Sequence, residues 1–173
     1  MTSAEELDWE VRAARVEDAD AMGEVMVESF LEAHRDHLPR ASWEARRRDW
    51  TPEVSAAGWR RELEGDGPEQ ERPCILVATR GAGVLGVAGA SPRADDRVEL
   101  EVLYVASDAQ RGGIGAGLLR EVMSWCRARG VRVLEVAVLT ANGPARGFYE
   151  RMGGQLVGER EFDEEGVLLP QVV

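Results

Sequence analysis

The chain of 173 residues contains no lysine, because all 21 of its basic residues are arginine. A lysine nucleophile, a lysine Schiff base and the lysine of a P-loop are therefore excluded from its chemistry. Cysteine is also scarce, with two in the chain. Cys74 and Cys126 lie far apart and outside any metal-ligand spacing, so the sequence predicts neither a disulfide framework nor a metal site.

Long apolar runs are absent as well. No segment approaches the length of a membrane span, and the first ten residues, MTSAEELDWE, form neither a basic nor an apolar leader. We therefore expect a cytoplasmic protein with no membrane partner. The net charge of −11 disfavours a nucleic-acid partner and suits a cationic substrate, although an acidic surface also serves solubility alone.

The composition is that of a globular protein, with 44% apolar and 31% charged residues. We expect residues 1–173 to form a single α/β domain, since this length suits one core. Apolar periodicity predicts strands at 9–15, 74–79, 84–90, 98–105, 131–139, 155–162 and 167–172. It predicts helices at 16–34, at 42–63 with a break at Pro52, at 114–129 and at 144–152.

The most informative segment runs from Glu99 to Gly153. An apolar strand there enters a loop with three glycines in four residues, Gly112, Gly113 and Gly115, and an amphipathic helix begins directly after it. Backbone amides and the positive end of the helix dipole converge at such a turn, and the glycines let a ligand approach closely. The loop therefore predicts a phosphate-binding site.

Two motifs make this segment resemble the GCN5-related N-acetyltransferase (GNAT) superfamily. The family's cofactor loop, Gln/Arg-x-x-Gly-x-Gly/Ala, is present as QRGGIG at 110–115. The pattern Asn-x-x-Ala-x-x-Phe-Tyr-x-x-x-Gly is present at 142–153. The expected order of elements also matches the family over the full length. One departure is Gly154, which stands where the family usually has a large apolar residue.

The resemblance implies a mixed, mostly antiparallel sheet flanked by helices, with two central strands splayed to form an acetyl-coenzyme A (acetyl-CoA) cleft. It implies an acyltransferase that moves acetyl from acetyl-CoA to a primary amine of a small molecule or peptide, by direct attack and without a metal. A homodimer is common in the family. Acetyl-CoA contacts are implied for the Leu103 and Val105 backbones, Asn142, Tyr149 and the loop residues Gln110, Arg111, Gly112, Gly113, Ile114, Gly115 and Ala116.

The resemblance also implies two catalytic side chains. Tyr149 matches the position where many members place the acid that protonates the departing thiolate, a step that a phenol suits. Packing beside Phe148 is the alternative role for Tyr149. Asn142 either contacts the cofactor arm or caps the short helix.

Glu99 lies where several members carry the base that takes the amine proton. Period-two alternation predicts that Glu99 and Glu101 share a strand face with Leu103 and Val105, toward the cleft. A solvated strand end is the alternative for both carboxylates. If Glu99 is not the base, the histidines at the end of the first helix, His34 and His37, are the next proton acceptors.

Other functions stay open. A non-catalytic acetyl-CoA sensor would keep the loop without turnover. An ATP-binding module is disfavoured because the loop lacks the P-loop lysine, and a dinucleotide fold is disfavoured because the third glycine of its fingerprint is missing. The sequence leaves the acceptor undetermined among small amines, polyamines, aminoglycosides, amino acids and protein N-termini.

Overall fold

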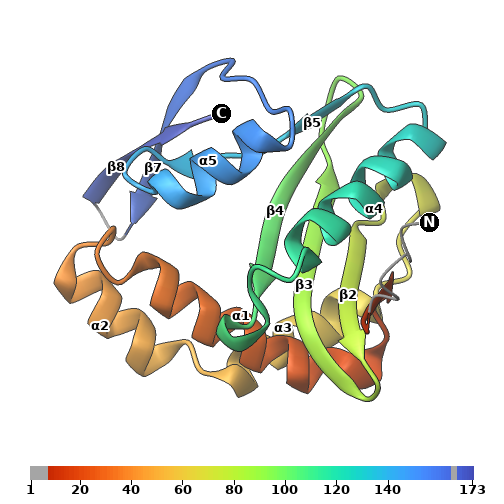
Figure 1. The fold of residues 1–173 in the computed structure, drawn as a ribbon, viewed down its shortest axis with the longest axis horizontal. Helices are drawn as coiled ribbons and strands as arrows, with labels where there is room; N and C mark the ends of the chain where they lie inside the picture. Colours follow the sequence, from red (N-terminus) through yellow and green to blue (C-terminus); the bar gives the residue numbers. More distant parts are fainter. Residues whose placement is uncertain (1–7, 165–166) are drawn as a thin grey trace, which may run out of the picture.

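The computed structural model describes residues 8–164 and 167–173, which form two β-sheets flanked by helices (Figure 1). The first sheet has the strand order β1-β2-β3-β4-β5, antiparallel except for the parallel pair β4–β5. Its strands are β1 (Glu10–Ala13), β2 (Cys74–Arg80), β3 (Gly83–Pro92), β4 (Arg97–Val105) and β5 (Val133–Glu135). The second sheet, of order β6-β8-β7, contains β6 (Val138–Leu139), β7 (Glu159–Glu164) and β8 (Val167–Val172).

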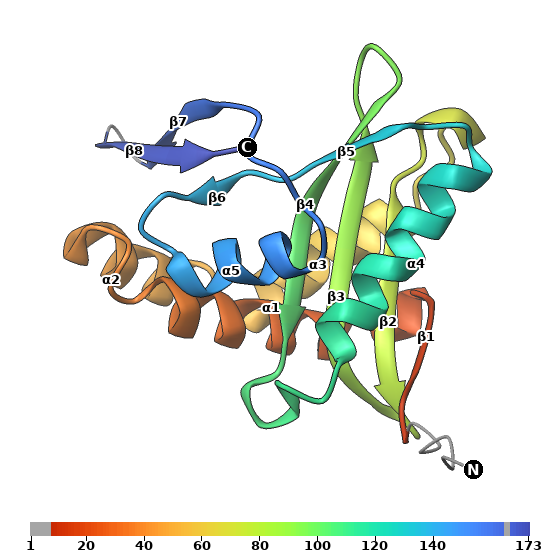
Figure 2. The same cartoon turned by 45° about the horizontal axis from the view of Figure 1, so that its top comes forward.

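The helices cover both faces of the first sheet (Figure 2). They are α1 (Ala19–His34), α2 (Arg40–Asp49), α3 (Pro52–Leu63), α4 (Ile114–Ala128) and α5 (Gly143–Arg151), with short 3₁₀ turns at Val16–Asp18, Glu69–Glu71 and Ser107–Ala109. The apolar face of α4 packs on one side of the sheet, and α1 with α3 packs on the other. Small residues in the sheet allow α4 to lie close, since a Cβ on Gly86 would stand 3.1 Å from Leu118 Cδ1.

The splayed strands implied by the resemblance are present. β4 pairs with β5 only from Arg97 to Glu99, opposite Val133 to Glu135. The chain then leaves the first sheet and forms β6 in the second sheet, so the single strand expected at 131–139 is divided in two. The mixed, mostly antiparallel fold class is confirmed, and the opening between the two sheets is the feature that positions the site.

Side chains along β4 change phase at Glu101. Gly89 of β3 pairs with Val102, while the next residue, Ala90, pairs with Leu100. Glu101 is therefore an extra residue opposite β3, which is a β-bulge. A bulge moves every later side chain of the strand to the opposite face from the one that strict alternation predicts.

The prediction that Glu99 shares a strand face with Leu103 and Val105 is therefore wrong. Leu100, which follows Glu99, packs in the α4-side core together with Leu103 and Val105. Glu99 must point to the opposite face of the sheet, because neighbouring residues in a strand alternate. Nothing in the sequence pattern marks the position of an inserted residue.

The last hairpin also differs from the expectation. β7 begins at Glu159 rather than at residue 155, and Leu156 and Val157, which suggested an earlier start, are 65% and 72% exposed. Glu164, expected in the turn, ends β7 and is 1% exposed. The remainder of the expected turn, residues 165–166, lies outside the described residues.

Candidate active site

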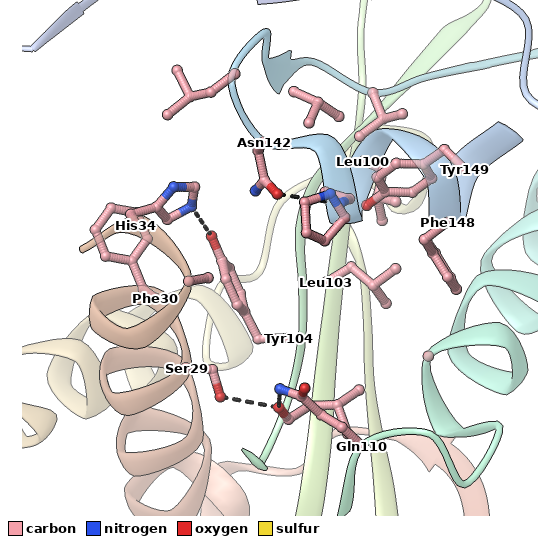
Figure 3. A pocket seen from close by; sticks show the side chains of 18 of the residues that line it. Ser29, Phe30, His34, Leu100, Leu103, Tyr104, Gln110, Asn142, Phe148 and Tyr149 are labelled. Carbon is pink, nitrogen blue, oxygen red and sulfur yellow. Dashed lines mark hydrogen bonds between the residues drawn. The ribbon is translucent and has the colours of Figure 1, made fainter. Parts of the chain in front are cut away.

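A cleft of about 1080 Å³ occupies the opening between β4 and residues 136–139, which follow β5 and include β6. One end is formed by the glycine loop and the start of α4, which we call the loop end. The other, which we call the α1 end, is lined by Phe30, His34, Arg46 and Tyr104, and α5 lies along the cleft between them (Figure 3). Of the loop residues implied in cofactor binding, all except Gly112 line this cleft, as do Leu103, Val105, Asn142 and Tyr149.

The glycine loop presents a row of backbone amides at the loop end. Gly113 is in the left-handed region with φ 81°, and so is Arg111 with φ 64°. Within the described residues, no oxygen accepts a hydrogen bond from the amides of 111–116, and the first bonded amide of α4 is that of Gly117, to Gly113 O at 2.9 Å. Unpaired amides at a helix N-terminus attract anions such as phosphate.

The side chain of Trp9 supports the glycine loop through a hydrogen bond. Its indole Nε1 donates to the carbonyl of Gly112 at 3.2 Å. Since the carbonyl and the next amide of a trans peptide point in opposite directions, this bond turns the Gly113 amide away from Trp9. The indole also lies against α4, where a Cβ on Gly117 would stand 2.6 Å from the ring. The Gly112 carbonyl thus points to Trp9, which agrees with the position of Gly112 outside the lining of the cleft.

The free edge of β4 forms one wall of the cleft. Beyond Glu99, no described strand pairs with this edge. The Val105 carbonyl accepts hydrogen bonds from the Ser29 hydroxyl at 3.2 Å and from Gln110 Nε2 at 3.1 Å. A ligand amide that approaches this carbonyl must share or replace those bonds, whereas the implied contact at Leu103 meets no such competition from a side chain.

Asn142 and Tyr149 reach the cleft from α5. Asn142 caps this helix, because its Oδ1 accepts from the Ala145 amide at 3.2 Å, and Pro144 supports the first turn. It also lines the cleft, so the cap and the ligand contact are compatible. The Tyr149 ring packs edge-on against Phe148 and extends into the cleft (Figure 3). Burial, with a smaller contribution from Tyr104, raises the pKa of Tyr149 above its usual value, which keeps the phenol protonated.

Glu99 and Glu101 lie in a network of ion pairs. Glu99 accepts from Arg93 at 3.0 Å and from Arg160 of β7 at 2.6 Å, which ties the second sheet to the first. Partial burial opposes ionisation of Glu99, but the hydrogen bonds and charges of Arg160 and Arg93 outweigh it and lower the pKa of the carboxyl. Glu101 pairs with Arg93 and Ser91. Glu101 lines the cleft, and Glu99 is not among the lining residues.

At the α1 end, His34 Nε2 lies 3.2 Å from the Tyr104 hydroxyl. Burial, together with the nearby His37 and Arg46, lowers the pKa of His34 to about 4, so the imidazole is neutral at neutral pH. The Nδ1 atoms of His34 and His37 are buried and find no hydrogen-bond partner among the residues that the structure describes. His34 is thus an uncharged base inside the cleft, whereas His37 is not among the residues that line it.

An ion pair between the half-buried Arg46 and the buried Glu164 closes the α1 end. Arg46 of α2 donates from Nε and Nη2 to the two carboxylate oxygens of Glu164, at 2.7 and 2.8 Å. The same guanidinium lies 5.4 Å from the centroid of the Phe30 ring. This bidentate pair joins α2 to β7, two elements from opposite ends of the chain, and thereby fixes the second sheet over the cleft.

Other chemistries find little support in the described part of the chain. No group of three histidine, cysteine or carboxylate side chains gathers there to hold a metal ion. Burial raises the pKa of Cys74 to about 12 and also raises that of Cys126, so neither thiol ionises readily. None of the helices in the described ranges is long and apolar enough to cross a membrane.

Sequence reasoning missed several residues that line the cleft, namely Ser29, Phe30, Arg46, Tyr104, Phe162 and Gln171. Most of these come from α1, α2 and the second sheet, which carry no motif. Tyr104 was within the predicted strand, but only the bulge decides which face it takes. The available signal was composition, since Tyr104 is one of two tyrosines in the chain.

Comparison with known proteins agrees with this geometry. The model of the acetyltransferase (GNAT) family matches residues 26–154. A probable N-acetyltransferase, camello, from Xenopus tropicalis is 33% identical over 85 residues, which cover 48% of this chain and 39% of that protein. The chain therefore aligns with well under half of the length of this relative.

Solved structures share the fold at low sequence identity. The PaiA N-acetyltransferase of Thermoplasma acidophilum, in complex with coenzyme A, superposes with a TM-score of 0.71 at 20% identity, over 95% of this chain and 97% of that one. A ribosomal-protein-alanine N-acetyltransferase from Brucella melitensis gives 0.63 at 24% identity, over 94% and 96%. Because the family model matches residues 26–154, three quarters of the chain, the chain belongs to the acetyltransferase (GNAT) family.

Proposed function

We propose that residues 1–173 form one N-acetyltransferase domain that transfers acetyl from acetyl-CoA to a primary amine of a small molecule or peptide by direct attack. One observation carries the proposal: loop amides and the Tyr149 phenol line the same cleft, along an edge of β4, and within the described ranges the amides have no hydrogen-bond partner and no strand pairs with this edge beyond Glu99. The amides of 111–116 suit a pyrophosphate, and the β4 edge suits the amides of a pantetheine arm.

Tyr149 is the proposed acid. When the amine nitrogen bonds to the acetyl carbon and the carbon–sulfur bond breaks, the phenol donates its proton to the sulfur. The raised pKa of Tyr149 favours this role, since the hydroxyl holds its proton until a stronger base, the thiolate, appears beside it. Within the described residues no hydrogen bond occupies the Tyr149 hydroxyl, which leaves it available to a ligand.

Glu99 is the proposed base, and it acts through a water molecule because its carboxylate is not on the lining of the cleft. Its lowered pKa keeps it ionised, but the two arginine partners reduce its basicity. His34 is the second candidate. It lines the cleft as a neutral imidazole and contacts Tyr104, so the amine proton has a direct route to it.

A thiol-release assay tests the proposal. Purified protein with acetyl-CoA is incubated with a panel of polyamines, aminoglycosides, amino acids and peptides, and free coenzyme A is quantified. Acetylated product and equimolar thiol with at least one amine are expected. Binding of acetyl-CoA without turnover on any amine would favour the alternative of a non-catalytic sensor. Fractionation and light scattering test the proposed cytoplasmic location and a homodimer.

A further inference from the structure

A second, smaller cavity of about 310 Å³ lies beside Tyr149, between α4, the start of β5 and the end of α5. Its lining is mainly aliphatic and includes Leu119, Met123, Val131, Leu134 and Met152. Two exposed arginines, Arg127 and Arg132, also border it. A cavity of this size and lining is suited to a short hydrocarbon chain.

This cavity adjoins the cleft. Leu100, Val136 and Tyr149 line both spaces, so their side chains form the wall that the two share. Tyr149 is the residue that the proposed function places beside the thioester sulfur. A chain attached to the thioester carbon therefore starts at this shared wall.

Two successive glycines enlarge the space. Gly153 and Gly154 line the cavity and contribute no side chain to it. Gly153 has φ 92°, which suits glycine, and a Cβ on Gly154 would stand 2.9 Å from the Tyr149 carbonyl oxygen. The end of α5 thus turns tightly against Tyr149 and leaves this side of the cavity without a bulky residue.

We propose that the second cavity is an acyl subsite, and that the protein accepts saturated acyl-CoA donors longer than acetyl. The inference rests on the proposed function for the position of the thioester. The bonds are those of acetyl transfer: the amine nitrogen bonds to the acyl carbon, the carbon–sulfur bond breaks, and the amine proton is lost while the thiolate is protonated. The added methylenes pass between Leu100 and Val136 into the aliphatic space, where a chain without polar groups requires no hydrogen-bond partner.

Binding gives the first test and needs no turnover. Dissociation constants of coenzyme A, acetyl-CoA, butyryl-CoA and hexanoyl-CoA are measured by calorimetry. Each buried methylene is expected to tighten binding by roughly fourfold until the cavity is full. Equal affinity for all three thioesters would overturn the subsite.

Matched variants give the second test. Val131→Phe fills the cavity, and Val133→Phe adds the same side chain at a position that is 45% exposed and lines neither space. We expect Val131→Phe to lower the ratio of hexanoyl to acetyl kcat/KM by tenfold or more, and Val133→Phe to leave that ratio at the wild-type value. Val136→Ala, which thins the shared wall, is expected to raise it.

The two proposals fail separately. If acetyl is transferred but neither Val131→Phe nor Val136→Ala changes the ratio, the acyl subsite is wrong and the proposed function stands. If no amine is acylated by any donor while binding still tightens with chain length, the proposed transfer is wrong and the subsite stands.

Discussion

The imidazole of His34 and the phenol of Tyr104 meet at the α1 end of the cleft, with Nε2 3.2 Å from the hydroxyl oxygen. The contact joins the end of α1 to the part of β4 that lies beyond its pairing with β5. Burial is the main reason that the imidazole stays neutral, and this neutrality affects both stability and catalysis.

We expect His34 to make the fold sensitive to mild acid. In the unfolded chain its pKa is near 6.5, and in the folded protein it is about 4, so the unfolded state binds more protons between these values. The His34 contribution to stability is complete above about pH 6.5 and is lost as pH falls toward 4. Urea unfolding of wild type and His34→Gln at pH 7.5 and 5.0 measures it. The variant should lose less stability over this interval, and parallel losses would contradict the expectation.

The glycine loop should be required for ligand binding beyond its effect on the fold. Gly113→Val places a β-branched residue at φ 81° among the backbone amides of the glycine loop. We therefore expect acetyl-CoA to lose its effect on the melting temperature. Gly81→Val is the matched control, since Gly81 has φ 57° in the β2–β3 turn and does not line the cleft. Both variants should be less stable, and only the control should retain the shift. A normal shift in Gly113→Val would remove the loop from the proposed site.

Removal of the Tyr149 hydroxyl should affect turnover and spare binding. Tyr149→Phe keeps the ring against Phe148, so the fold should survive. We expect kcat to fall by about 10²-fold or more, the scale of general acid catalysis, with little change in the Kd of acetyl-CoA. Steady-state kinetics and calorimetry separate the two effects. An unchanged kcat would reduce Tyr149 to a packing residue.

The base can be assigned by comparing Glu99→Gln with His34→Gln. The pKa of Glu99 lies below its usual value and that of His34 is about 4, so neither group titrates between pH 6 and 9. A rise of kcat/KM over this interval then reports deprotonation of the acceptor amine. The variant that lacks the base should have a kcat/KM that is lower at every pH, by about 10²-fold. Glu101→Gln is the control and should have the smaller effect.

The pair between the half-buried Arg46 and the buried Glu164 should be costlier to break than an exposed pair. Glu164→Gln leaves a guanidinium facing a neutral amide at a site where the carboxylate is 1% exposed. We expect a loss of about 1–3 kcal/mol in the free energy of unfolding, because Arg46 is itself partly exposed. Glu44→Gln, which breaks the exposed pair with Arg40, should have a much smaller effect, because solvent screens that pair. Comparable small losses in the free energy of unfolding for the two variants would show that the pair between Arg46 and Glu164 stabilises the fold no more than an exposed pair does.

The parts of the site that the sequence predicted are local. The loop at 110–115 and the cap of α5 at Asn142 each depend on residues within a few positions, so motif and structure coincide there. The phase change at Glu101 depends on pairing with β3, and Arg46 meets Glu164 across a separation of 118 residues. Such contacts follow from the packing of whole elements, which periodicity in one segment does not encode. Apart from His34, which the sequence analysis named, the residues of the α1 end were missed for this reason.

The free edge of β4 has a consequence for hydrogen exchange. Residues 100–105 pair with β3 on one side, and no described strand covers the other. Backbone amides directed to the uncovered side are protected only by what the cleft contains. In the free protein, their exchange with deuterated solvent should therefore be faster than that of the amides that pair with β3. A ligand that adds to this edge as an extra strand would slow the exchange of alternate amides along 100–105 and leave their neighbours unchanged. The period of that protection would report the register of the bound ligand against β4, residue by residue.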